Sequence, residues 1–345
     1  VATGPRLGPG FGFGGQAPES GQGGLGGTPF SGPADPGAAP YDSSSGGAQA
    51  TQSQLTGLVR IASTLKYQGG LAAGTGMILT SSGEVVTNHH VVQGATTIRV
   101  TVMSTGQQYS ATVVGVDAKD DVAVLQLSNA TGLATVRTDS SPVTVGEAVT
   151  AVGDAGGSST VFTAANGSVS AVDQHITTNS QDGRTSERLS GLIEISSDVI
   201  SGDSGGATYD EQGGVVGMTT AASTGGRDIV GYAIPIAQVL QISGDLENGV
   251  QNARYEYGAP AFAGISLEGS GTTVAGVFPG TPAELAGITP GDTITHVGTT
   301  RVHTSAALRR AITSYSPGDR VTLGWTDSLG TSHVAGVTLI AGPVA

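Results

Sequence analysis

Three short stretches of the chain carry the residue types that catalyse attack on a carbonyl carbon. The first contains His89 and His90, the second contains Asp120 and Asp121, and the third is the run Gly-Asp-Ser-Gly-Gly around Ser204. A serine hydroxyl is a poor nucleophile at neutral pH, so it needs an imidazole to take its proton and a buried carboxylate to orient that imidazole. The order histidine, aspartate, serine therefore predicts nucleophilic catalysis by Ser204.

Within each pair, the neighbouring residues favour one member. We expect His90 to be the general base at the end of a strand, because it fits the pattern Thr-Asn-x-His-Val. Consecutive strand residues point to opposite faces, so only one histidine can enter a cleft, and His89 is the alternative. We expect Asp121 to orient the imidazole because it directly precedes the apolar run Val122–Leu127, and Asp120 is the alternative.

The glycines around Ser204 have a predicted role of their own. Gly202 would allow a tight loop whose backbone N–H group forms an oxyanion hole together with the N–H of Ser204. Gly205 and Gly206 would let the backbone fit closely behind the serine. The competing interpretation is a glycine-rich turn without function in a chain that contains 57 glycines. The histidine and aspartate motifs upstream favour the catalytic interpretation.

Composition argues against several other classes of protein. The 345 residues carry a net charge of −13, which argues against a nucleic-acid partner. Cysteine is absent and the histidines lack ligand spacing, so we expect no disulfide, no metal and no cofactor. No apolar run approaches the length of a membrane span. We expect an extracytoplasmic protein, secreted or membrane-anchored through an upstream segment that has been removed.

The chain divides into four predicted parts. Residues 1–54 are rich in Gly and Pro and are expected to be a disordered tail. Residues 55–243 contain many short strands at regular spacing, which predicts a sandwich or barrel. Residues 244–258 are polar and poorly patterned, which favours a linker. Residues 259–345 form a second β-rich domain with one helix at about 305–314.

Five segments resemble the HtrA/Deg family, and within it the secreted actinobacterial branch that includes mycobacterial PepA. They are residues 73–78, 87–91, 121–125, 202–206 and 217–221. The resemblance covers about residues 55–345. It implies a mainly β fold, with a chymotrypsin-like double β-barrel protease domain over 55–243 and a PDZ domain over 259–345. It also implies that His90, Asp121 and Ser204 are the catalytic triad.

The same resemblance implies a specificity pocket near Asp198, Thr220 and Ala221. Asp198 lies six residues before Ser204, where trypsin-like enzymes place an acidic residue at the pocket floor, so it would favour basic residues. Relatives usually prefer small or medium aliphatic residues, which is the default expectation. Asp203 departs from the family, since many relatives have Asn before the serine.

In the second domain, residues 275–283, 285–288 and 290–294 resemble the centre of a bacterial PDZ domain. Such a domain adds a peptide as a strand at a sheet edge and captures its terminal carboxylate with backbone N–H groups. The matching loop consists of Phe262, Ala263, Gly264 and Ile265. The alternative is a β-rich spacer. Residues 175–188 correspond in position to the family's sensor loop, and an ordinary exposed hairpin is an equal alternative.

The implied function is a serine endopeptidase that degrades or processes unfolded or exported proteins in extracytoplasmic quality control. The PDZ domain would bind peptide C-termini, and a homo-oligomer is compatible with this function. Two alternatives stay open at this point. One is a peptide-binding chaperone or adaptor with a resting protease site, and the other is a protease that processes one dedicated partner.

Overall fold

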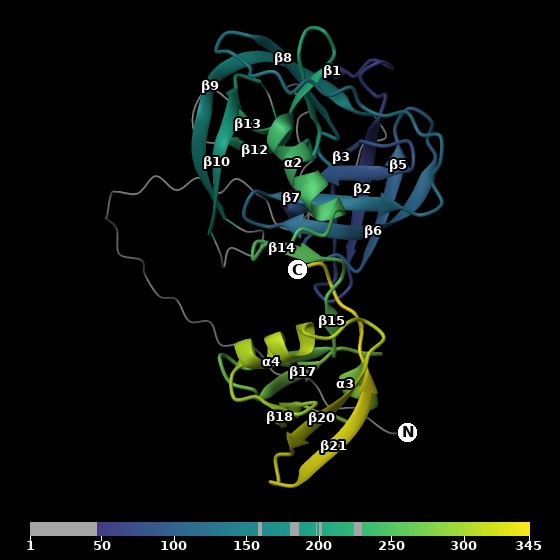
Figure 1. Cartoon of the computed structure of the whole chain (residues 1–345), viewed down its shortest axis with the longest axis vertical. Helices are drawn as coiled ribbons and strands as arrows, with labels where there is room; N and C mark the ends of the chain where they lie inside the picture. The colour runs from purple at the N-terminus through teal and green to yellow at the C-terminus, as the bar shows by residue number, and fades with distance from the viewer. Residues whose placement is uncertain (1–46, 158–160, 180–185, 198, 200–201, 224–229) are drawn as a thin grey trace, which may run out of the picture.

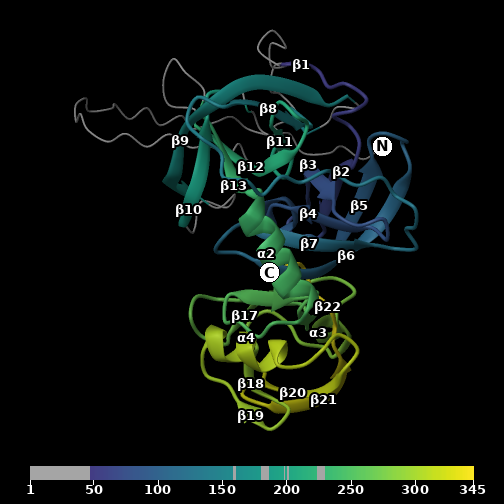
Figure 2. The same cartoon turned by 45° about the horizontal axis from the view of Figure 1, so that its top comes forward.

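The structure is a computed structural model that describes residues 47–157, 161–179, 186–197, 199, 202–223 and 230–345. Two β-barrels lie side by side, and a smaller domain lies below them (Figures 1 and 2). The protein is mainly β, as the alternation of polar and apolar residues predicts. The predicted double barrel followed by a second β-rich domain is confirmed.

The first barrel has the strand order β6-β5-β2-β3-β4-β7, and it closes because β6 also pairs with β7. A strand from later in the chain, β14, pairs with the outer edge of β6. A single helical turn, α1 (His89–Val92), follows β4. The strands are β2 (Leu58–Leu65), β3 (Gly70–Ile78), β4 (Glu84–Thr87), β5 (Thr97–Val102), β6 (Gln108–Asp117), β7 (Val122–Leu127) and β14 (Tyr255–Tyr257).

The second barrel has the order β9-β10-β13-β12-β11-β8, and pairing of β8 with β9 closes it. All of its strand pairs are antiparallel, which suits short connections between neighbours. The strands are β8 (Ala148–Gly153), β9 (Thr163–Asn179), β10 (Ser186–Ile195), β11 (Ala207–Tyr209), β12 (Val215–Ser223) and β13 (Val230–Pro235), with β1 (Ala48–Gln49) attached to β9.

The helix α2 (Ile236–Glu247) lies over the junction of the two barrels (Figure 1). It buries Leu246 in an apolar cluster that also contains Met77 of the first barrel and Phe162 and Met218 of the second. One continuous core therefore joins both barrels and α2, and it fixes the barrels against each other where their edges meet.

The C-terminal domain surrounds its own core, which includes Leu308, Leu323 and Trp325. The predicted helix at 305–314 is confirmed as α4, which is capped where the Ala307 N–H donates to the Thr304 hydroxyl over 3.1 Å. The elements are β15 (Ala261–Phe262), β16 (Ile265–Leu267), β17 (Val274–Val277), α3 (Pro282–Leu285), β18 (Thr293–Val297), β19 (Thr300–Arg301), α4 (Ser305–Thr313), β20 (Arg320–Thr326), β21 (Ser332–Thr338) and β22 (Ile340–Ala341).

The end of the predicted tail belongs to the second barrel. Residues 1–46 lie outside the described part of the chain, but Ala48 and Gln49 pair with β9 as β1. Ala50 is buried, and its N–H donates to the carbonyl of Phe162 over 2.9 Å. Small residues pair through their backbones without a large apolar side chain, so composition alone gives no signal of this strand.

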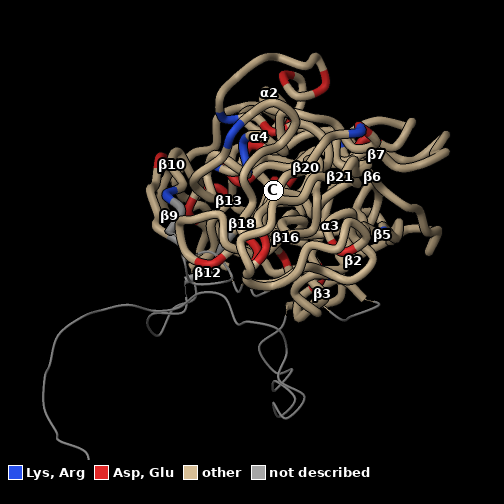
Figure 3. The backbone as a smooth tube through the Cα atoms, turned by 90° about the horizontal axis from the view of Figure 1, so that it is seen from below, with Lys and Arg blue, Asp and Glu red and all other residues tan. Residues whose placement is uncertain are grey.

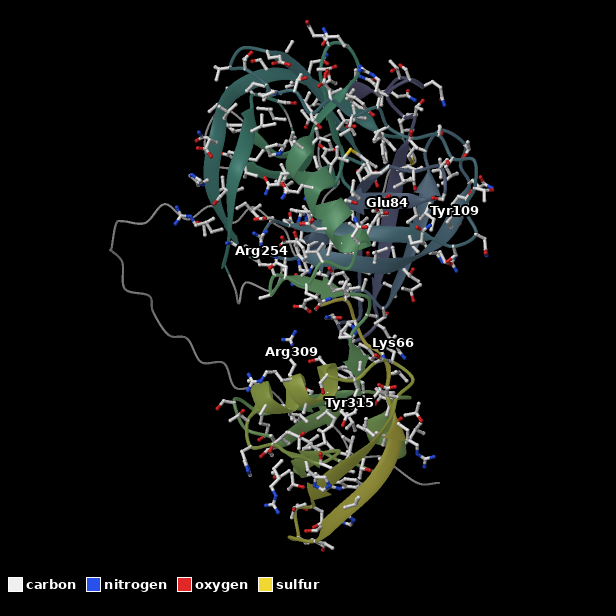
Figure 4. All side chains as sticks on the ribbon, viewed as in Figure 1. Lys66, Glu84, Tyr109, Arg254, Arg309 and Tyr315 are labelled. Carbon is white, nitrogen blue, oxygen red and sulfur yellow. The ribbon has the colours of Figure 1, made fainter. Side chains whose placement is uncertain are left out.

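The predicted linker over 244–258 is largely part of the first domain. Its first residues complete α2, because Leu246 continues the apolar face of that helix. Tyr255–Tyr257 form β14 on the first barrel. Arg254 lies in the chain between α2 and β14 (Figure 4). Its guanidinium forms ion pairs with the carboxylates of Asp117 and Asp120.

The buried carboxyl of Glu84 makes the stability of this core pH-dependent. Glu84 lies beside α2, where the Ser243 hydroxyl donates to it over 2.6 Å (Figure 4). Burial, with the hydrogen bond and charge of Glu247, raises its pKa from 4.5 to about 7, although the Ser243 bond acts in the opposite direction. The folded state therefore holds a proton that the unfolded chain releases, so the contribution of Glu84 to stability is greatest below pH 4.5 and falls until about pH 7.

We expect Glu84→Gln to remove most of this loss of stability. The wild type should lose up to about 2–3 kcal/mol of unfolding free energy between pH 5 and 8 through Glu84, and the variant should not. Chemical denaturation at both pH values measures the difference. The exposed Glu211→Gln serves as the matched control and should behave like the wild type. An equal loss in Glu84→Gln and the wild type would contradict the assignment.

Candidate active site

The structure carries His90 on a helical turn, so the prediction of a strand at this position is wrong. Strand β4 ends at Thr87, and Asn88 is the N-cap of α1. The Asn88 side chain turns the chain here by donating to the carbonyl of Asp121 over 2.9 Å. The two imidazoles still point to different partners. The His90 Nδ1 faces Asp121, whereas the Nε2 of His89 contacts the carbonyl of Ala345.

Asp121 is held from three sides, directly before β7. Its carboxylate accepts the backbone N–H of His90 over 3.0 Å, the His90 Nδ1–H over 2.9 Å and the Thr220 hydroxyl over 2.6 Å. Its backbone has φ 54°, a left-handed conformation that Asp tolerates better than most residues. The alternative, Asp120, bonds Arg254 instead. The structure therefore pairs Asp121, and not Asp120, with His90.

The environment of Asp121 favours the ionised carboxylate. Burial raises the pKa of this carboxyl, but the charge of His90 and hydrogen bonds from His90 and Thr220 outweigh burial. The net result is a pKa below the ordinary value of 3.8. An ionised Asp121 accepts the Nδ1–H of His90, which leaves the Nε2 of that ring as the basic nitrogen.

Ser204 comes from the second barrel and is linked to Asp121 through one residue. The Ser204 hydroxyl donates to the carbonyl of Thr220 over 3.2 Å, while the Thr220 hydroxyl donates to Asp121. The carbonyl of Ser204 accepts the N–H of Thr75 in β3 over 2.9 Å. Residues from both barrels thus meet at one point, and Thr220 joins the serine to the aspartate.

The loop around Ser204 depends on two glycines. Gly202 has φ 102° and Gly205 has φ 84°, both in the region that favours glycine. A Cβ atom on Gly202 would lie 2.0 Å from the carbonyl oxygen of Asp154, and one on Gly205 would lie 2.0 Å from that of Thr75. Both positions therefore exclude a side chain, as the tight-loop interpretation predicts.

Two backbone donors of this loop differ from their neighbours in having no acceptor in the described part of the chain. Within the described residues, the N–H groups of Gly202 and Ser204 have no hydrogen-bond partner. The neighbouring N–H groups of Gly205 and Gly206 donate to the carbonyls of Thr219 and Asp203. An oxyanion site needs pre-positioned donors that are not already bonded, and the N–H groups of Gly202 and Ser204 meet this requirement.

Sequence reasoning missed three residues that hold this site. Thr75 bridges β3 to the serine loop, since its hydroxyl donates to the carbonyl of Gly202 and accepts the N–H of Asp154, both over 3.0 Å. Asn88 holds the backbone of Asp121. Thr220 was expected in a specificity pocket, yet its hydroxyl bonds the Asp121 carboxylate. The sequence marks these residues only by their positions. Asn88 directly precedes the two histidines, and Thr75 and Thr220 lie inside the segments on which the family resemblance rests.

The predicted specificity pocket stays a prediction for all three residues, since the bond of Thr220 to Asp121 does not exclude a place for Thr220 in that pocket. Asp198 lies outside the described residues, and Ala221 is described only as part of β12. The segment at 175–188 forms the facing ends of β9 and β10, with residues 180–185 outside the described part. Asp203, the departure from the family pattern, is buried.

The four predicted peptide-binding residues line a cleft of about 2180 Å³ between the domains. The same cleft reaches Gly202 of the serine loop. Among the described strands, β16 pairs only with β17, so its other edge is open for a peptide strand. The open edge and α4 contribute apolar residues to the lining of the cleft: Ile265, Leu267, Leu308 and Ile312.

In the view from below, the Lys and Arg positions of the described chain are few. Lys and Arg positions lie apart, except for a small group beside α4 (Figure 3). Arg309 and Arg310 of α4 line the cleft. No helix within the described part is long and apolar enough to span a membrane. The described residues also contain no group of three His, Cys, Asp or Glu residues placed to hold a metal.

Comparisons with known proteins divide the chain in the same way. Residues 74–218 match the family "Trypsin-like peptidase domain", and residues 249–326 match "PDZ domain". The chain is 34% identical over 290 residues to the serine protease Do-like HtrA of Lactococcus lactis subsp. lactis (strain IL1403), covering 77% of this chain and 70% of that protein.

A second relative is the periplasmic serine endoprotease DegP of Escherichia coli (strain K12), which is 32% identical over 269 residues. That match covers 74% of this chain and 54% of DegP, so the chain spans 54–70% of the length of these two curated relatives. A solved serine endoprotease from Yersinia pestis superposes with a TM-score of 0.48 at 22% identity, over 85% of this chain and 98% of that one. Placement in the actinobacterial branch stays a prediction.

Proposed function

Because the chain belongs to the HtrA family of serine proteases, we propose that it is a serine endopeptidase with Ser204 as nucleophile. The observation that carries the proposal is the hydrogen-bonded path from Ser204 through Thr220 and Asp121 to His90. It joins the three residue types that peptide-bond hydrolysis needs, and along the chain they follow one another in the order His, Asp, Ser that chymotrypsin-like proteases use.

The proposed reaction starts with transfer of the Ser204 proton to the Nε2 of His90. The freed oxygen attacks the scissile carbonyl and gives a tetrahedral intermediate, whose negative oxygen accepts the N–H groups of Gly202 and Ser204. The imidazolium of His90 then protonates the leaving amine, and an acyl-enzyme remains. His90 next takes a proton from water, which attacks the ester and releases the acid. Asp121 keeps the Nδ1–H in place throughout.

We further propose that unfolded or exported chains are the substrates. Their free C-termini would bind at the loop of Phe262, Ala263, Gly264 and Ile265, and the peptide would add as a strand to the open edge of β16. The cleft shared with Gly202 would let a tethered chain reach the serine loop without leaving the protein.

The cellular setting is proposed from the relatives. DegP and DegQ of Escherichia coli are named periplasmic endoproteases, which favours an extracytoplasmic location and a quality-control role for this chain. Secretion and anchoring are both consistent with this location. Assembly into a homo-oligomer is compatible with this role. Small or medium aliphatic residues are the expected preference before the scissile bond.

Labelling with an active-site phosphonate probe tests the proposed activity. We expect one covalent adduct per chain, located by peptide mass spectrometry on Ser204, and parallel degradation of denatured casein. An adaptor with a resting site predicts neither labelling nor degradation, but it predicts binding of a fluorescent peptide with a free C-terminus. A folded wild type that binds such a peptide and is never labelled would refute the protease proposal.

A further inference from the structure

The segment at residues 342–345 leaves the C-terminal domain and docks on the first barrel. It continues β22, which pairs with β15 next to the predicted peptide-binding loop. The Val344 N–H donates to the carbonyl of Ala95 over 2.9 Å, and the Gly94 N–H donates to the carbonyl of Val344 over 2.8 Å. In both views the end of the chain lies between the two domains (Figures 1 and 2). We call residues 342–345 the docked segment.

The side chain of Val344 belongs to the core of the first barrel. It is 6% exposed, and its apolar cluster includes Val91 and Val92 of α1 and the neighbouring Ala95. The docked segment therefore contributes both backbone bonds and buried apolar surface to the region around α1.

His89 connects the docked segment to the catalytic machinery. Its Nε2 lies 2.5 Å from the carbonyl oxygen of Ala345, and its side chain is buried. Its backbone N–H donates to the carbonyl of Asp121 over 3.3 Å. The residue directly before His90 is thus bonded on one side to Asp121 and on the other to the docked segment.

A second contact seats the C-terminal domain close to the same place. The ring of Tyr67, in the β2–β3 hairpin, packs against Phe262 at 4.9 Å and Phe278 at 4.7 Å between ring centroids. Lys66, in the same hairpin, lies at the junction of the domains (Figure 4). The aromatic contact and the docked segment hold the domain against the first barrel together.

We propose that the docked segment is a positioning element for His90. The helix α1 has only four residues, and one turn of helix does not hold its shape without outside contacts. Those contacts come from Asp121, from the barrel core and, through Val344 and Ala345, from the docked segment. This inference rests on the proposed function, since the position of His90 matters only if that residue activates Ser204.

Hydrogen exchange tests the structural part of the proposal, which is that the docked segment holds α1 in place. The measurement does not depend on activity, so it uses inactive variants. Each variant carries Ser204→Ala, so self-cleavage cannot interfere. Val344→Ser should speed amide exchange in residues 88–95 at least roughly tenfold, because it removes a contact that keeps these amides closed. The matched control is Val337→Ser, an equally buried valine (6% exposed) in the core of the C-terminal domain. Exchange in residues 88–95 that is the same in both variants would overturn the proposal.

Steady-state kinetics with a short peptide substrate test the link to His90. Val344→Ser should lower kcat roughly ten- to hundredfold and leave KM nearly unchanged, because a small misplacement of a catalytic group has an effect of this size. His89→Ala should act alike, and His89→Gln, which keeps a donor toward Ala345, should recover part of the loss. Wild-type kcat in Val344→Ser and His89→Ala would overturn the proposal. A wild type that the phosphonate never labels would instead refute the proposed function, and hydrogen exchange would still decide on the docked segment.

Discussion

Ser204→Ala is expected to lower kcat for cleavage of denatured casein by a factor on the order of 10⁶. The substitution removes the hydroxyl that we propose as the nucleophile, so His90 and Asp121 have no serine to activate. The residues of such a triad act as one unit, so losing the serine costs about as much as losing all three. The fold should remain, because within the described part of the chain the Ser204 hydroxyl makes a single hydrogen bond, to the carbonyl of Thr220.

Gel-based degradation of casein and phosphonate labelling measure this effect, with circular dichroism as the check on folding. The matched control is Ser243→Ala, a second buried serine whose hydroxyl bonds Glu84 and takes no part in the proposed chemistry. It should change stability and leave kcat within a few-fold of the wild type. If Ser204→Ala keeps more than roughly 1% of wild-type activity and still reacts with the phosphonate, another residue is the nucleophile.

Local patterns predicted the strands that present the site. Val122–Leu127 forms β7 with the same bounds as the apolar run in the sequence. All residues of this strand except Gln126 are buried, so a continuous apolar run marks the strand in the sequence. Asp121 was placed correctly for the same reason, since it stands at the start of an apolar strand.

Contacts between segments that are far apart in the chain leave no comparable pattern in the sequence. The helical turn α1 is too short to show a periodicity of 3.6 residues, so the strand signal of Val85–Thr87 was extended over His90. The strand β1 has two residues and the docked segment has four, so neither is long enough to show a periodic pattern in the sequence. Thr220 is an ordinary strand residue in the sequence, and only the meeting of the two barrels gives its hydroxyl a partner in Asp121.

Asp121→Asn is expected to lower kcat by roughly 10⁴-fold with little change in KM. The side-chain oxygen of Asn can still accept the backbone N–H of His90, where Oδ1 of the aspartate does so over 3.0 Å. The amide group then takes the place of Oδ2, which in the wild type accepts from the His90 Nδ1 and from the Thr220 hydroxyl. An amide donates a hydrogen bond at this place, so Nδ1 becomes the acceptor and Nε2 carries the proton. That tautomer cannot take the proton of Ser204.

The neighbouring residue provides the control for this effect, because Asp120→Asn changes the same side chain one position earlier. Asp120 bonds Arg254 at the edge of the first barrel, so its substitution should affect stability and leave kcat within a few-fold of the wild type. Michaelis–Menten kinetics on both variants with one peptide substrate separate the two aspartates. Equal losses in the two variants, or a loss below roughly tenfold in Asp121→Asn, would show that the carboxylate does not set the tautomer of His90. The large predicted difference between adjacent residues follows from geometry alone, since only Asp121 faces the imidazole.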